Sequence, residues 1–152
     1  MANQIIKTQD TVSGVEGSAY AIIDGRRELL FYLKNFRSEL KFDDAVVSGI
    51  GKRIKGHKQG MANGTWKATM YYMTEIFRNI VLKQIKSGIT VYFDIMIVND
   101  DKNSSSGRKT TIHKICSLDG AVISQIDESK PSLEEDISGY FEDVDTPEKF
   151  ML

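Results

Sequence analysis

Apolar side chains occur along this chain in short runs, some of which alternate with polar side chains, and such runs are typical of β-strands rather than helices. The clearest run is residues 65–71, where Trp66, Ala68 and Met70 share one face and the intervening side chains share the other. That pattern predicts a half-buried strand. Further strands are predicted over residues 18–23, 29–42, 89–98, 110–117, 121–126 and 133–141.

The strand predicted over residues 29–42 has an irregular apolar pattern. Its first part places Leu29, Phe31 and Leu33 on a buried face. After Leu33 the parity of the apolar positions changes, so the strand needs a β-bulge or a bend. Beyond that point the buried face is predicted to continue through Phe36, Leu40 and Phe42.

Glycine marks the ends of two predicted elements. Asp24-Gly25 follows the first strand and favours a tight hairpin turn. Gly88 ends the one predicted helix, which Thr74 and Glu75 open. The face of this helix at three-and-four spacing comprises Ile76, Phe77, Ile80 and Val81, and it is expected to continue through Gln84 and Ile85. We expect that face to cover one side of a sheet.

Several short strands with one helix predict a mainly β, α+β protein, an antiparallel β-sandwich or barrel with one flanking α-helix. With 152 residues, residues 1–152 are predicted to form a single domain. Residues 1–13 have no sustained period and are expected to be an N-terminal arm, which could dock on a neighbouring subunit. Residues 43–64 are rich in glycine and predict a long loop or an extended hairpin, a candidate interaction surface.

Candidate chemistry is sparse. The single cysteine, Cys116, lies in an alternating run and is predicted to be a buried structural thiol. Cys116, His57 and His113 match no zinc-ligand spacing, and residues 56–60 lack the full phosphate-loop pattern. The sequence therefore predicts no catalytic residue, metal site or cofactor, and we do not expect an enzyme.

The net charge of −1 gives no general attraction to nucleic acid or to a membrane surface. The N-terminal residues lack the apolar run of a signal peptide, and no stretch approaches the roughly 20 apolar residues of a membrane span. We therefore expect a protein that is made and folded in a cytoplasm, without membrane anchoring.

Charge is nevertheless segregated along the chain. A basic segment comprises Lys52, Arg53, Lys55, His57 and Lys58, and an acidic C-terminal group comprises Glu134, Glu135, Asp136, Glu142, Asp143 and Asp145. Within one chain, the two groups could form salt bridges or separate solvated faces. Between chains, a basic segment that meets an acidic end makes a heterologous contact, which builds a ring or a filament when repeated. The acids follow no EF-hand spacing, so a solvated acidic face is expected rather than a calcium site.

Three blocks of the sequence carry a family resemblance. They are Asp10–Gly17; Gly51–Lys58 with Ala62–Thr65 and Ala68–Tyr71; and Ser132–Asp136 with Phe141–Lys149. Together they resemble the tail tube proteins of phage-like element PBSX and of related contractile phage tails and R-type bacteriocins. The order and spacing of the blocks hold across almost the whole chain.

The resemblance implies a phage tail tube fold and a structural, self-assembling protein. In that family, copies close into hexameric rings whose inner strands join into one barrel around a channel, and the rings stack into a tube. The channel passes DNA in a phage or ions in a bacteriocin particle. The implied partners are further copies of the chain, the tail sheath protein and baseplate or tube-initiator proteins, with DNA only as transported cargo. The implied location is the cytoplasm of the producing bacterium during assembly and the released particle afterwards.

Two other functions remain open at this point. One is the related tube protein of a type VI secretion system, which gene neighbourhood or the sheath around the tube would distinguish. The other is a small β-barrel module that binds nucleic acid or another ligand through the basic, glycine-rich segment, which salt-dependent DNA binding would reveal.

Overall fold

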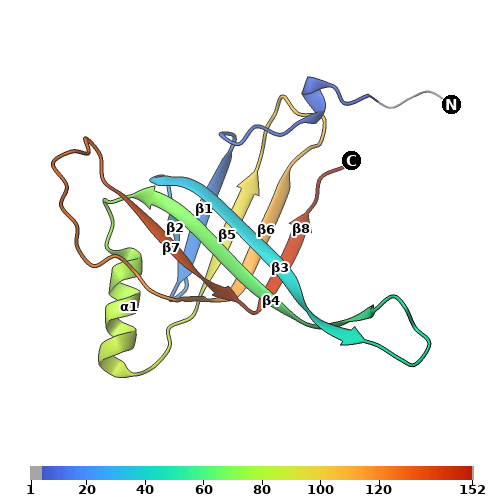
Figure 1. The fold of residues 1–152 in the computed structure, drawn as a ribbon. Coiled ribbons are helices and arrows are strands. Elements are labelled where there is room, and N and C mark those ends of the chain that lie inside the picture. Colours follow the sequence, from blue (N-terminus) through green and yellow to red (C-terminus); the bar gives the residue numbers. More distant parts are fainter. Residues whose placement is uncertain (1–4, 152) are drawn as a thin grey trace.

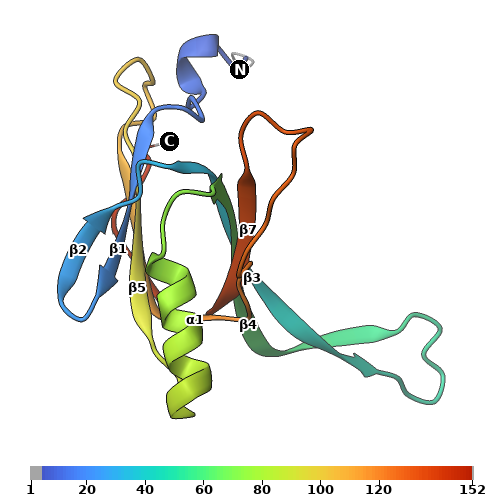
Figure 2. The same ribbon diagram turned by 90° about the vertical axis from the view of Figure 1, so that its left-hand side faces the viewer.

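The computed structural model describes residues 5–151 of the chain. Its elements are a 3-10 turn at Thr8–Asp10, β1 (Gly17–Ile23), β2 (Arg26–Leu29), β3 (Leu33–Val47), β4 (Gly56–Tyr71), α1 (Ile76–Ser87), β5 (Phe93–Asn99), β6 (Lys109–Leu118), β7 (Glu134–Phe141) and β8 (Asp143–Glu148). All strand pairs are antiparallel. Two layers of strands lie side by side with α1 at the open side between them (Figures 1 and 2). The predicted antiparallel β fold with one flanking helix is confirmed for the described residues.

The strands follow one path, β2-β1-β5-β6-β7-β4-β3, with β8 beside β6. The two layers share β6, whose first part pairs with β5 and β8 and whose last residues, Ser117 and Leu118, pair with β7. Ile115 has a positive φ of 56°, which bends β6 between these two partners. The bend lets one continuous sheet fold over itself and enclose a core.

A close backbone approach at this bend requires glycine at position 139. Gly139 lies opposite Leu118, and a Cβ at this position would overlap the carbonyl oxygen of Ser117. Any side chain here would push β6 and β7 apart, at the point where the two layers join.

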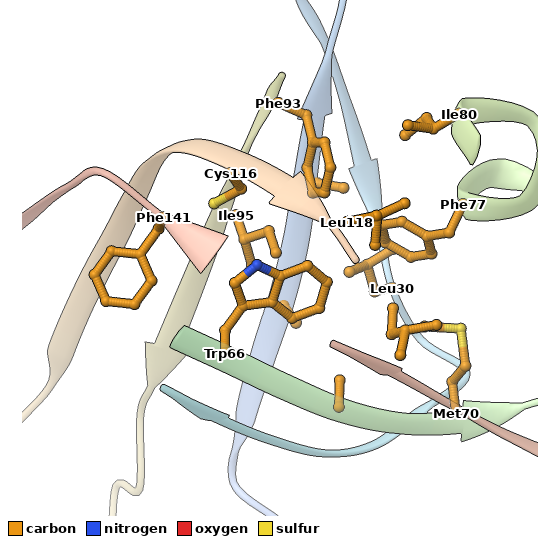
Figure 3. Close-up of a cluster of buried hydrophobic side chains, with 14 of the residues drawn as sticks. Leu30, Trp66, Met70, Phe77, Ile80, Phe93, Ile95, Cys116, Leu118 and Phe141 are labelled. Carbon is orange, nitrogen blue, oxygen red and sulfur yellow. The ribbon is translucent and has the colours of Figure 1, made fainter. Parts of the chain in front are cut away.

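The core lies between the layers, and the strand predicted at residues 65–71 supplies its centre. Trp66, Ala68 and Met70 are buried on one face of β4, as the alternation predicted. The Trp66 ring stacks on Phe36 at 5.9 Å and meets Phe93 edge-on at 6.2 Å between ring centroids. Figure 3 shows this cluster with the side chains that α1 adds to it.

The helix and the first turn also agree with the sequence. Gly88, with φ 72°, ends α1 and donates its N–H to the Gln84 carbonyl. Asp24 and Gly25 both have positive φ, as a two-residue hairpin turn requires. Within residues 5–151, no helix has the length and apolarity to cross a membrane.

The strand predicted over residues 29–42 is wrong in its first part. The structure has two strands there, separated by a turn in which the Leu33 N–H binds the Leu30 carbonyl. Because the chain passes from one layer to the other at this turn, strand alternation does not apply across it. Leu30 and Tyr32 are buried instead, while Leu29 and Phe31 are exposed. The predicted bulge after Leu33 is present in the β3–β4 register.

Three further differences concern the ends of the sheet. Leu40 and Phe42 were predicted to be buried but are exposed, because β3 runs past the edge of the sandwich there. The strand predicted over residues 121–126 is absent, although the segment begins with three apolar residues. Residues 143–148 do form one, β8, which the acidic composition and Pro147 concealed.

The N-terminal arm predicted at residues 1–13 can be described from residue 5 onward. It lies on the turn between β5 and β6 of its own chain. Ser105 donates its N–H to the Gln9 carbonyl at 2.8 Å, and Ser13 donates its N–H to the Asp101 carboxylate at 2.9 Å. Residues 1–4 of the predicted arm lie outside the described residues.

Candidate functional site

Residues 40–64 form a two-stranded arm, here called the projecting hairpin, which leaves the sandwich and extends into solvent (Figures 1 and 2). Of the two forms left open for residues 43–64, the structure has the extended hairpin. β4 stays paired with β7 as far as Gly64, opposite Phe141, and then separates from it. The close approach of the two strands at this last pair requires glycine, since a Cβ on Gly64 would lie 2.6 Å from the Phe141 carbonyl oxygen.

The projecting hairpin exposes several large apolar side chains. Leu40 and Phe42 lie on the same side of β3 as Phe36, which faces the core within the sandwich. On β4, the residues paired with Leu40 and Phe42 are Gly64 and Ala62. Beyond the sandwich nothing covers them, so Leu40 is 53% and Phe42 59% exposed. After the bulge near Asp43 the hairpin also exposes Val46, Val47, Ile50 and Ile54. Exposed apolar side chains gathered on a projecting arm are typical of a surface that is covered in an assembly.

The basic segment lies at the tip of this arm. Lys52, Arg53, Lys55 and Lys58 are exposed, and no described residue forms a salt bridge with any of them. His57 Nδ1 lies 2.6 Å from a carboxylate oxygen of Asp44 on the opposite strand. The tip therefore carries four cations that are available to a partner.

The acidic group predicted at the C-terminal end does not form one surface. Glu134 pairs with Lys34 at 2.5 Å, and Asp145 pairs with Lys114 at 2.5 Å. Asp136 accepts a hydrogen bond from the Thr69 hydroxyl at 2.6 Å. Glu142 and Asp143 are exposed where β7 continues into β8. None of the six acids forms a salt bridge with the basic tip within residues 5–151.

Glu135 is buried, so it does not belong to an exposed contact surface as predicted. Its carboxylate binds the Arg78 guanidinium of α1, and both side chains are less than a twentieth exposed. Arg78 also donates to Glu75 at 2.9 Å and to the Thr74 and Val122 carbonyls. The pKa of Arg78 is raised, and the hydrogen bond to Glu75 is the largest cause, so the guanidinium stays charged. This pair joins α1 to β7, and sequence reasoning missed it because neither residue has a distinctive neighbour pattern.

The remaining titratable groups of interest belong to the core. Cys116 is a buried free thiol, as predicted, and burial raises its pKa to about 12. His113 packs between Phe36 and Phe141 and contacts the Ser38 hydroxyl at 2.8 Å. Burial lowers its pKa. The described residues contain no cluster of three or more His, Cys, Asp or Glu that could hold a metal ion.

Comparison with known proteins agrees with this geometry. The family model described as "Phage tail tube protein" matches residues 4–148. The "Phage-like element PBSX protein XkdM" of Bacillus subtilis (strain 168) is 35% identical over 145 residues, which is 95% of this chain and 95% of that relative. The resemblance inferred from the three sequence blocks is therefore confirmed.

Solved structures support the fold independently of sequence. The SPP1 tail tube has a TM-score of 0.65 at 13% identity, over 92% of this chain and 81% of that one. A chain of the PVC sheath-tube complex, from an extracellular contractile injection system in its extended state, has a TM-score of 0.63 at 11% identity, over 91% and 93% of the two chains. The chain thus belongs to the phage tail tube protein family, and it is a structural subunit of a tail tube.

Proposed function

We propose that copies of this chain close into hexameric rings, and that these rings stack into the inner tube of a contractile phage-type tail. The observation that carries the proposal is the projecting hairpin of this tail tube family member, which exposes both large apolar side chains and a free basic tip. An isolated domain gains nothing from such an arm, whereas repeated contacts with other copies bury it.

The basic tip meets acids of a neighbouring copy in this proposal. Lys52, Arg53, Lys55 and Lys58 supply the cations, with His57 beside them. Glu142 and Asp143 remain as exposed candidate partners, and Asp145 is a third exposed acid, although it pairs with Lys114 in the single chain. Since the tip and these acids differ, the contact is heterologous, as the closure of rings or the stacking of rings requires.

The polar face of β3, β4 and β7 lines the channel. Thr65, Lys67 and Thr69 on β4 point away from the core, as do Glu134 and Asp136 on β7. Opposite charges are mixed on this face, as in the Lys34–Glu134 pair, so it holds polyanionic DNA weakly. A channel of this kind passes DNA in a phage, or ions in a headless particle, without retaining it.

The remaining features of the proposal follow from the family. The tube is enclosed by a tail sheath protein and starts on baseplate or tube-initiator proteins. The chain performs no bond chemistry and needs no cofactor. It assembles in the cytoplasm of the producing bacterium and ends in the released particle.

Negative-stain electron microscopy tests the proposal. The purified protein is imaged over a concentration series, and again after co-expression with its neighbouring sheath and baseplate genes. Six-fold rings or hollow tubes of uniform width are expected. Dispersed small particles in every condition would refute the tube, and rings of another symmetry would refute the hexamer alone.

A further inference from the structure

Two cations lie side by side on the polar face of the layer formed by β3, β4 and β7. Arg37 of β3 is paired directly with Lys67 of β4. Both side chains point away from the core, because their strand neighbours Phe36 and Trp66 point into it and stack on each other. Like charges directly opposite one another on a sheet are destabilising. A pair that breaks this local rule is a candidate for a function.

The two cations border a hollow on this face. Its volume is about 200 Å³, and Glu39, Asp119 and Ser138 are among the other residues that line it. Ser138 continues the row of the cations, since it is the residue of β7 that pairs with Lys67. The hollow therefore gathers side chains from three neighbouring strands and from the segment that follows β6.

The two carboxylates of the hollow already have donors. The Nε of Arg37 lies 2.9 Å from one oxygen of Glu39, and the Nζ of Lys41 lies 3.5 Å from the other. The Ser138 hydroxyl donates to the Asp119 carboxylate and lies 2.9 Å from each of its oxygens. Glu39 is thus shared by two cations, and neither acid is directed at a third.

Lys67 is the cation of this group that has no acid partner. Its side chain is exposed, and none of the salt bridges formed within residues 5–151 includes it. Arg37 is only partly engaged, because its contact with Glu39 is made through Nε and its side chain is 71% exposed. The terminal guanidinium nitrogens of Arg37 and the ammonium of Lys67 are therefore donors available to an anion. Such charged donors make strong hydrogen bonds to phosphate oxygens.

We propose that Arg37 and Lys67 form an oxyanion-binding site that takes a phosphate group. A phosphate held by both cations replaces their mutual repulsion with attraction to a shared partner. The inference rests on the proposed function in one respect, since the phosphates of passing DNA reach the site only if this face lines the channel. Because the site is exposed and two carboxylates lie near it, binding is weak, in the millimolar range. A weak site contacts the DNA backbone as it passes but does not retain it.

Titration of the unassembled protein with inorganic phosphate tests the site. Phosphate replaces sodium chloride at constant ionic strength, and the backbone amides are followed by two-dimensional NMR. We expect saturable shifts at residues 37, 67 and 138, with a millimolar dissociation constant. Shifts that do not saturate, or that occur at the basic tip of the projecting hairpin instead, would overturn the site.

Two glutamine variants separate this site from general electrostatics. Lys67→Gln removes a charged donor to the anion, so phosphate affinity should fall by ~10-fold or more. Its thermal midpoint should equal or exceed that of wild type, because the repulsion from Arg37 is also removed. Lys86→Gln is the matched control, since Lys86 is exposed and outside the salt bridges of the described residues but lies on α1.

The control should bind phosphate like wild type, and an equal loss of affinity in both variants would overturn the site. Should Lys67→Gln fail to fold, the location of the shifts in the wild-type protein decides the matter.

A short DNA duplex in place of inorganic phosphate distinguishes two sources of the same chemistry. Shifts at the same amides, which weaken as salt increases, would support contact with the diester phosphates of DNA. A response to inorganic phosphate alone would overturn the contact with DNA and leave a site for free phosphate. None of these titrations requires a tube, so the site can fail while rings form, and it can stand when imaging finds no rings. Failure of this inference is therefore distinguishable from failure of the proposed function.

Discussion

The buried ion pair between Arg78 and Glu135 supports a quantitative prediction. Glu135→Leu places an apolar side chain of similar size at this buried position. The Arg78 guanidinium is then left without its buried partner. Removing one member of a buried pair costs about 3–5 kcal/mol of unfolding free energy, because the other charge stays desolvated. Glu75 still accepts from Arg78 at 2.9 Å, but its own side chain is 67% exposed, so it compensates only in part.

A chain of this size loses about 2–4 °C of thermal midpoint per kcal/mol, so the expected fall is about 6–20 °C. Thermal unfolding followed by circular dichroism measures it, at a protein concentration where no tubes form, since assembly would stabilise the folded state. Glu134→Leu is the matched control. Its partner Lys34 is exposed, and a surface pair contributes about 0–1 kcal/mol.

A double variant shows whether the charge is the cause. Arg78→Met combined with Glu135→Leu removes both charges, and it should be more stable than Glu135→Leu alone. Recovery stays incomplete because the Thr74 and Val122 carbonyls lose a donor. A loss under about 1 kcal/mol for Glu135→Leu, equal to the control, would refute the reasoning that this pair is desolvated.

Three further predictions concern stability and assembly. Burial lowers the pKa of His113 below its value in the unfolded chain, so wild-type stability should fall by up to about 1.4 kcal/mol per pH unit as pH decreases below about 6.5. Urea unfolding measured from pH 7.5 to 5.5 should show this dependence of stability on pH, and His113→Gln should lack it. Gly139→Ala should destabilise the fold by about 1–3 kcal/mol or more, whereas Gly120→Ala, with open space around its Cβ, should stay within about 1 kcal/mol in the same urea assay. Lys52→Glu with Arg53→Glu should shorten tubes in light scattering while leaving the thermal midpoint unchanged; unchanged tube length would remove the basic tip from the contact.

Local patterns were sufficient for the parts of the fold that depend on neighbours in sequence. The alternation around Trp66 predicted which face of β4 is buried, and Gly88 predicted the end of α1. The two-residue alternation of the sequence matches the alternation of side chains on β4, and β4 does not change layers over residues 65–71. The end of α1 depends only on the backbone conformation of Gly88. The Asp24-Gly25 turn was predictable for the same reason, since its geometry is fixed by two residues.

Prediction failed where the tertiary path decides burial. Leu30 and Tyr32 are buried because the chain crosses between layers there, and an alternation pattern holds no information about that crossing. The acidic group was treated as one surface, but Glu135 alternates inward and meets Arg78 from a distant element. The packing of α1 against β7 in the folded chain brings these two residues together, so their spacing in the sequence could not reveal the pair.

In the proposed assembly, the apolar and the basic parts of the projecting hairpin would contribute different amounts of contact energy. Leu40, Phe42 and Val47 are each about half exposed, and burying the remainder of three such side chains is worth about 2–4 kcal/mol. An exposed ion pair at the tip contributes about 0–1 kcal/mol and weakens with salt. In the proposed assembly, the exposed apolar side chains would therefore supply most of the contact energy, and the cations at the tip would select the partner surface and its orientation. Repulsion between like basic tips would disfavour contacts between two hairpins, which leaves the proposed heterologous contact as the favourable one.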